Sequence, residues 1–180
     1  AFERSFAVDK PLNEKTGKPY GKDTKAYAEW SEETGLDSIT RWELASIGEM
    51  EASLRDGCPG LFLEGPSEVT FRDDAYAIDT KGLVLRRQCR ADKLVCGNMV
   101  EWIYDVKTCT DLGKFEVEAL RYGYQYQAAW YLSVSGASKF LLVAIDKCEP
   151  YRCGVFEFDA LVLENARIKN ELDFRDLSGY

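Results

Sequence analysis

The alternation of apolar and polar positions predicts four helices and five strands along this chain. Apolar side chains recur every three or four residues in the helical segments, and Thr40-Arg41-Trp42-Glu43 forms a capping box before one of them. Two of the strands flank Cys96-Gly97-Asn98, which is typical of a hairpin turn. Helices are expected at 24–33, 40–57, 115–134 and 159–172, and strands at 67–71, 83–95, 99–108, 139–145 and 152–158.

This order of elements predicts an α/β (α+β) fold in which helices flank a mixed sheet. The length suits one domain over residues 1–180, with the functional core within 67–160. Residues 1–25 are polar without apolar periodicity, which predicts an irregular N-terminal arm, and an Asp-rich loop is expected after the strand at 67–71. No apolar run approaches the roughly eighteen residues of a membrane-spanning helix, so no membrane association is expected.

Composition narrows the chemistry, because the chain contains no histidine. This excludes Ser-His-Asp and Cys-His catalysis, histidine–metal centres and HNH-type nuclease chemistry. Any metal site must use carboxylates or cysteines. Six cysteines without a visible secretion signal favour reduced thiols in a cytoplasm, although Cys148 and Cys153 could supply part of an iron–sulfur site. The net charge of −8 argues against a passive DNA-coating protein but allows a nuclease with a local basic groove.

An Asp-x-Lys triplet in an apolar strand is the most informative motif. Three such triplets occur, at 23–25, 79–81 and 105–107, and only the last follows apolar strand residues. Strand alternation places Asp105 and Lys107 on one face of the sheet. If the strands at 83–95 and 99–108 pair through their short turn, Asp92 comes close to Asp105.

Two carboxylates beside a lysine suit metal-assisted hydrolysis of a phosphodiester. The oxygens of Asp92, Asp105 and the backbone carbonyl of Val106 are ligands that Mg²⁺ or Mn²⁺ prefers. The metal would activate a water molecule, and Lys107 would orient or deprotonate that water and offset charge on phosphorus. The alternative is a solvated strand face that carries an ordinary Asp–Lys pair.

Gln127 and Tyr131 lie four residues apart in the helix predicted at 115–134. This spacing places them on one helical face with Leu120 and Tyr124. Either that face packs into the core and accommodates one glutamine, or the helix docks beside the Asp105 strand so that Gln127 forms hydrogen bonds near the site.

Taken in order, these motifs resemble the PD-(D/E)xK nuclease superfamily. The segments are Arg90-Ala91-Asp92, Tyr104-Asp105-Val106-Lys107-Thr108 and Tyr124-Gln125-Tyr126-Gln127-Ala128-Ala129-Trp130-Tyr131. The chain is most similar to RecB-like exonucleases with a Q-x-x-x-Y motif, and within them to the exonuclease VIII (RecE-type) group of phages and prophages. The resemblance implies a restriction-endonuclease-like core, metal binding by Asp92 and Asp105, and catalysis by Lys107 with support from Gln127 and Tyr131. Glu68 lies where such proteins often carry a further acidic residue, so it is a further candidate for the metal site.

The chain also departs from that pattern. Ala91 replaces the usual proline, and the second acid is Asp105 rather than glutamate. Many RecB-like members carry a histidine ligand on an early helix; here either Glu49 or Glu51 substitutes for it, or this ligand is missing. The number of bound metal ions, one or two, is therefore left open by the sequence. The cysteine pattern that holds an iron–sulfur cluster in some relatives is not matched here.

Basic residues near these motifs are candidates for phosphate contacts. They are Arg86, Arg87, Arg90, Lys93, Lys114 and Arg121. The alternative is a charged strand edge that prevents aggregation. Tyrosines in the Gln127 segment could stack on unpaired bases, although most are expected to pack the helix against the sheet.

The resemblance implies a metal-dependent DNA exonuclease that resects double-stranded ends 5′ to 3′ and leaves single strands for recombination. It also implies a cytoplasmic bacterial or phage-encoded protein, a homo-oligomer that encircles DNA, and a single-strand annealing protein as a partner. The alternative is a non-catalytic nucleic-acid-binding or recombination-partner domain on the same fold. Endonucleolytic cleavage by the same site is a third possibility.

Overall fold

The computed structural model describes residues 6–8, 10–78, 84–97 and 100–178, which fall into two compact units, Ala1–Ala52 and Ser53–Tyr180. In the first unit, β1 (Phe6–Val8) pairs in parallel with β2 (Asp37–Ile39). The prediction of an irregular N-terminal arm is therefore wrong for Phe6–Val8, because β1 pairs with a strand about 30 residues away. A strand of three residues is too short to show a periodic pattern.

Both helices predicted near the N-terminus are confirmed. The first, α1 (Lys25–Thr34), begins where the Thr24 hydroxyl accepts the Tyr27 N–H, and it ends at Gly35 in the left-handed region. The second, α2 (Arg41–Gly57), carries the predicted capping box. The Thr40 hydroxyl accepts the Glu43 N–H at 3.1 Å, and the Glu43 carboxylate accepts the Thr40 N–H at 2.7 Å.

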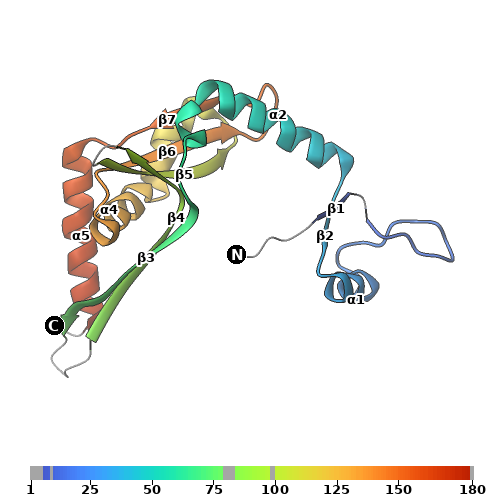
Figure 1. Ribbon diagram of the computed structural model, residues 1–180, viewed down its shortest axis with the longest axis horizontal. Coiled ribbons are helices and arrows are strands. Elements are labelled where there is room, and N and C mark those ends of the chain that lie inside the picture. The colour runs from blue at the N-terminus through green and yellow to red at the C-terminus, as the bar shows by residue number, and fades with distance from the viewer. Residues whose placement is uncertain (1–5, 9, 79–83, 98–99, 179–180) are drawn as a thin grey trace. The chain divides into compact units, whose positions relative to one another are not determined.

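The second unit is built on a five-stranded sheet in the order β3-β4-β5-β6-β7. Its β5–β6 pair is parallel and the other pairs are antiparallel, so the predicted mixed sheet is confirmed (Figure 1). The strands are β3 (Ser67–Ile78), β4 (Val84–Gly97), β5 (Val100–Cys109), β6 (Lys139–Asp146) and β7 (Cys153–Phe156). The helices of this unit are α3 (Phe115–Arg121), α4 (Tyr124–Ser135) and α5 (Ala160–Ser178), with short 3₁₀ turns η1 (Pro59–Phe62) and η2 (Leu112–Lys114).

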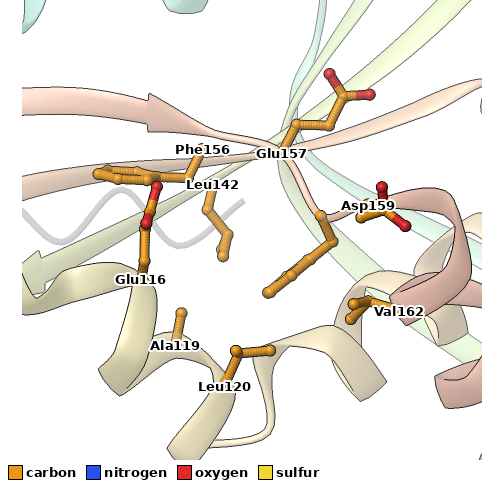
Figure 2. A pocket seen from close by; sticks show the side chains of 9 residues that line it. Glu116, Ala119, Leu120, Leu142, Phe156, Glu157, Asp159 and Val162 are labelled. Carbon is orange, nitrogen blue, oxygen red and sulfur yellow. The ribbon is translucent and has the colours of Figure 1, made fainter.

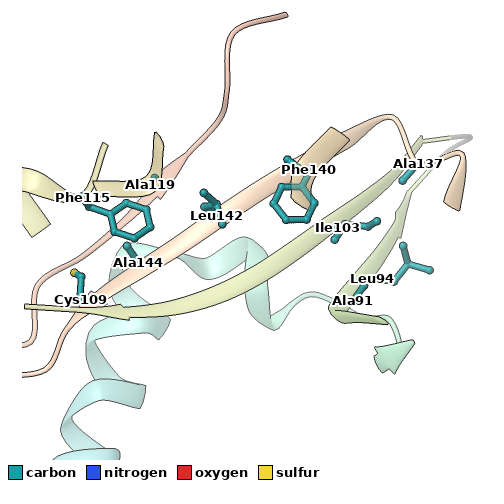
Figure 3. Packing of buried hydrophobic residues seen from close by; sticks show 11 residues of the cluster. Ala91, Leu94, Ile103, Cys109, Phe115, Ala119, Ala137, Phe140, Leu142 and Ala144 are labelled. Carbon is teal, nitrogen blue, oxygen red and sulfur yellow. The ribbon is translucent and has the colours of Figure 1, made fainter. Parts of the chain in front are cut away.

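Helical segments cover both faces of this sheet. On one face, Ile103, Phe140 and Leu142 pack with residues of α3 and α4 in a continuous core (Figure 3). On the other face, Tyr104 and Val143 pack against the end of α2 and against η1. The strand β6 is buried on both faces from Phe140 to Asp146, and burying one large aliphatic side chain stabilises a fold by about 1.5–3 kcal/mol.

The segment predicted as an Asp-rich loop is a strand, which corrects the sequence-based assignment. β3 continues to Ile78 because its backbone pairs with β4, for example Phe71 with Cys89 and Arg72 with Gln88, with a register shift after Asp73. Asp73 receives a hydrogen bond from Arg87 at 2.8 Å. Ladder pairing and this ion pair outweigh the low strand propensity of aspartate.

The single helix predicted at 115–134 is two helices. Gly123 has φ +77° between α3 and α4, a left-handed conformation that an α-helix cannot contain. The other differences are smaller: β7 is shorter than predicted, and α5, whose first turn is capped by Asp159 as predicted, extends past Leu172 to Ser178. None of the helices in the described ranges is both long and apolar enough to cross a membrane.

We expect Gly123→Ala to lower the free energy of unfolding by about 1 kcal/mol, because alanine tolerates the left-handed region poorly. A Cβ atom at this position would also lie 3.2 Å from the Tyr126 ring. Urea denaturation measures the loss. Gly123→Asn is the matched control, since asparagine adopts this conformation more readily and must lose less stability than alanine. Equal losses would show that crowding rather than backbone conformation sets the requirement for glycine.

Candidate active site

The centre of the candidate site is Asp105 on β5, with 2% of its surface exposed. Strand alternation places Ile103, Asp105, Lys107 and Cys109 on the face that α3 and α4 cover. The Lys107 ammonium lies 2.5 Å from Oδ2 of Asp105 and retains 23% side-chain exposure. The predicted Asp–Lys pair therefore exists, and one of its two members is buried.

Asp92 lies where β4 leaves β5. The paired register of the two strands ends at Lys93 with Tyr104, and Asp92 is the next residue on β4. Its Oδ2 accepts the Val106 N–H at 2.8 Å. The carboxylate thus takes the place of a strand carbonyl, and it joins Asp92 to the segment that carries Asp105 and Lys107, as the hairpin prediction required.

Gln127 on α4 reaches Asp105 from the helical layer. Its Nε2 donates a hydrogen bond of 2.9 Å to Oδ1 of Asp105. Tyr131, one turn further along α4, packs edge-on against Phe140 with 5.5 Å between ring centroids. The prediction that Leu120 shares this face is wrong, because Leu120 belongs to α3 and is 48% exposed.

Tyr124, which the sequence analysis placed on the Gln127 face, is a further contact of the site. Its ring centroid lies 5.2 Å from the Lys107 ammonium. A cation at this distance from an aromatic face is attracted to it and is restricted in position. Tyr124 stands three residues before Gln127, and both side chains face β5, as their predicted common helical face requires.

Burial raises the pKa of the Asp105 carboxyl above its ordinary value, because the charged form loses hydration. The hydrogen bond and positive charge of Lys107 oppose this effect, as does the Gln127 hydrogen bond, whereas the negative charge of Asp92 adds to it. Oδ2 of Asp105 is buried and forms no hydrogen bond of regular geometry; it faces the Lys107 ammonium. A buried carboxylate oxygen of this kind has capacity for a further cationic partner.

The donor set suits a hard divalent cation. Across the described part of the chain, no three His, Cys, Asp or Glu side chains form a metal-binding group. The available donors are the oxygens of Asp92, Asp105 and the Val106 backbone, all hard ligands. Glu49 and Glu51, considered above as substitutes for a histidine ligand, belong to the unit Ala1–Ala52. All six cysteines are free thiols, and Cys58 and Cys153 approach each other to 3.8 Å between sulfur atoms.

Glu68 is held outside this group of residues. It is exposed, adopts the left-handed region with φ +57°, and forms an ion pair with Arg90. Glu68 precedes Val69, which pairs with Ala91, so its backbone lies next to the strand segment of Asp92. In the structure its carboxylate is the ion-pair partner of Arg90.

The basic residues predicted near Asp92 separate onto two faces of β4. Arg87 faces α4: it pairs with Asp73, donates to Ser133 and is 10% exposed. Lys93 donates to the Gly65 carbonyl at 2.6 Å. The remaining candidates are exposed on strand or helix surfaces. Among them, Lys114 of η2 forms an ion pair with Asp111. The other three exposed candidates are Arg86, Arg90 and Arg121.

Asp146 is a second buried carboxylate, which the sequence patterns did not single out. Its Oδ1 accepts the Leu112 N–H at 2.7 Å, and its Oδ2 accepts Nε of Arg152 at 2.8 Å. It therefore fixes the turn η2, from which α3 starts. The sequence does not distinguish Asp146 from an ordinary surface residue, because a single aspartate at the end of an apolar strand is common.

The described part of the chain also contains a largely apolar pocket of about 210 Å³, and Asp92, Asp105, Lys107 and Gln127 do not line it (Figure 2). Leu142 and Phe156 of the sheet form one wall, and Leu120 of α3 and Val162 of α5 face them. Glu116, Glu157 and Asp159 stand around it. Among the described residues that line the pocket, these three carboxylates are the charged ones.

Comparisons with known proteins show the fold. No protein-family model and no curated protein matches the chain. The crystal structure of a “putative exonuclease” from Eubacterium rectale is similar, with a TM-score of 0.60 and 13% identity over 84% of this chain and 59% of that chain. The crystal structure of SSO0001 has a TM-score of 0.41 and 20% identity over 72% of this chain and 58% of that chain, too low to support an argument. The chain thus spans less than two thirds of either protein, and the first likeness shows a shared mixed α+β fold.

We expect Asp105→Asn to change the pH dependence of stability in metal-free buffer. Because the pKa of Asp105 is raised in the folded protein, the unfolded chain releases this proton first, and stability falls as the pH rises above the ordinary aspartate range. The amide removes this fall. Stability curves of the native protein and the variant, measured by urea denaturation between about pH 4 and pH 8, should converge in acid and diverge in favour of the variant toward neutral pH.

Asp111→Asn is the matched control with the opposite sign. The Gly113 N–H bond and Lys114 lower the pKa of Asp111, so its contribution is present at neutral pH and is lost in acid. This variant should be less stable than the native protein at pH 7 and equal to it in acid. Parallel curves for the native protein and Asp105→Asn would contradict the raised pKa of Asp105.

Proposed function

We propose that the chain is a divalent-metal-dependent deoxyribonuclease of the PD-(D/E)xK type. One observation carries the proposal: Asp105 is buried, is held between Lys107 and Gln127, and lies beside Asp92, which is bonded to the Val106 N–H. Each contact joins residues that the nuclease motifs single out. The likeness of the fold to the Eubacterium rectale protein agrees with this proposal.

The proposed metal ligands are Asp92, Asp105 and the Val106 backbone carbonyl, with Mg²⁺ or Mn²⁺ as the ion. A bound ion of this type polarises the scissile phosphate and lowers the pKa of a water molecule. The Asp92–Val106 hydrogen bond holds the first ligand, and Gln127 fixes the rotation of the Asp105 carboxylate. Gln127 is thereby a positioning residue, because it touches the ligand and not the substrate.

Lys107 is the proposed catalytic residue. Its ammonium is partly exposed, so it can donate hydrogen bonds to the attacking water or to a phosphate oxygen and offset the charge that develops there. Tyr124 limits the motion of this ammonium. Burial of Asp105 excludes bulk water, which strengthens each of these electrostatic interactions.

The resemblance supports a finer proposal: an exonuclease of the exonuclease VIII type that resects double-stranded ends 5′ to 3′ during recombination. Duplexes labelled at the 5′ or the 3′ end, and a circular duplex as control, test it. Release of the 5′ label first from linear DNA, with the circle intact, is expected. Cleavage of the circle would indicate an endonuclease with the same site.

We expect Mn²⁺ to raise the melting temperature of the native protein and to leave that of Asp105→Asn unchanged. An ion present at about 100 times its dissociation constant stabilises the folded state by about 2.7 kcal/mol. Differential scanning fluorimetry with and without Mn²⁺ measures the shift. Asp111→Asn removes the same charge at a residue outside the proposed metal ligands, so this variant should keep the Mn²⁺-induced shift in melting temperature. A full shift in Asp105→Asn would place the metal elsewhere, and no shift in the native protein would favour the non-catalytic alternative.

Lys107→Ala should reduce the single-turnover cleavage rate by about a hundredfold or more, as the loss of one electrostatic or general-base group usually does. DNA affinity should change little. Gln127→Ala should have a smaller effect on the rate, together with weaker Mn²⁺ binding, because it acts through Asp105. Rates at saturating Mg²⁺ compare the two variants. Equal, small effects would reduce Lys107 to a surface partner of Asp105.

A further inference from the structure

A polar hollow of about 180 Å³ lies next to Lys107, at the end of β5. Thr108 and Thr110, which follow Lys107 on the chain, form one side of it, and Tyr122 and Tyr124 form another. Tyr124 lines the hollow, and its ring also contacts the Lys107 ammonium of the candidate active site. The hollow and the candidate catalytic lysine therefore share one aromatic wall.

The arrangement of the two tyrosines leaves an aromatic surface open. Their ring centroids are 6.0 Å apart, and Tyr124 also packs toward the buried Phe115. Tyr122, at the junction of α3 and α4, is 63% exposed. An aromatic side chain this exposed is not needed to fill the core, and its position follows from the chain reversal at Gly123.

The other lining groups match the polar parts of a nucleotide. Lys147 is exposed at the rim and offers a positive charge for a phosphate. Thr110 also lines the hollow, and its hydroxyl can donate or accept hydrogen bonds. Glu118 can accept a hydrogen bond from an amino group of a base, and its negative charge disfavours a phosphate on its own side of the hollow.

We propose that this hollow binds an unpaired nucleobase of the DNA strand next to the scissile phosphate, with the base stacked on Tyr122. The inference rests on the proposed nuclease function and extends it, because it gives the substrate strand a binding subsite outside the metal ligands. Stacking accepts every base, since each has an aromatic face, so the subsite favours unpaired ends without selecting a sequence.

The test uses a duplex that carries 2-aminopurine at its frayed terminal nucleotide, with the full chain in EDTA so that no cleavage occurs. Binding of native protein should quench the fluorescence, because the base stacks on tyrosine. Tyr122→Ala should lose the quench and bind about 5- to 150-fold more weakly, the equivalent of about 1–3 kcal/mol. Tyr122→Trp should restore both. Tyr126→Ala is the matched control: this tyrosine on α4 is also exposed but does not line the hollow.

A second measurement works under cleavage conditions. Single-turnover rates in Mg²⁺ are compared for native protein and Tyr122→Ala, on a normal terminal nucleotide and on an abasic one. If the base stacks on Tyr122, the two losses are not additive, and the variant no longer distinguishes the substrates. Fully additive losses, or equal quenching in native protein and Tyr122→Ala, would overturn the subsite while leaving the nuclease intact. Absence of cleavage by the native protein in Mg²⁺ and in Mn²⁺ would instead overturn the proposed function, and the subsite with it.

Discussion

Burial of the Asp105 carboxylate is the constraint on which the rest of the candidate site depends. An ionised carboxylate on a covered strand loses its hydration, and it is tolerated only if charged and hydrogen-bonding partners replace the water. Lys107 and Gln127 supply these partners from β5 and from α4. Because one of them comes from the helical layer, the site forms only when α4 is docked on the sheet.

Two features of the backbone bring α4 into that position. Gly123 ends α3 in the left-handed region and starts α4 in a new direction, which presents Tyr124 and Gln127 to β5. Asp146 holds η2, the turn that precedes α3. Neither residue contacts Asp105, yet both set where its partner helix lies. Both residues therefore affect the candidate site through the position of α4 and not through a contact with the carboxylate.

The separation of β4 from β5 at Asp92 serves the same site from the sheet. Where a ladder ends, backbone N–H groups lose their partners, and a buried N–H without a partner is costly. The Asp92 carboxylate accepts the Val106 N–H and removes this cost. The same divergence leaves β3 and β4 paired with each other. On this two-stranded segment, alternation sends Arg87 toward α4 and Arg86 and Arg90 to the exposed face, so neighbouring arginines have different roles.

The sequence by itself determined the elements and contacts that depend on near neighbours along the chain. The capping box at Thr40, the common face of Asp105 and Lys107 and the nearness of Asp92 follow from helix, strand and hairpin geometry, which a few adjacent residues specify. The tertiary structure decided the rest. The burial of Arg87 and the contact of Tyr124 with Lys107 need partners at least 14 residues away, and the extension of β3 depends on its pairing with β4. Such contacts leave no local periodicity, because their energy comes from surfaces that meet only after the chain has folded.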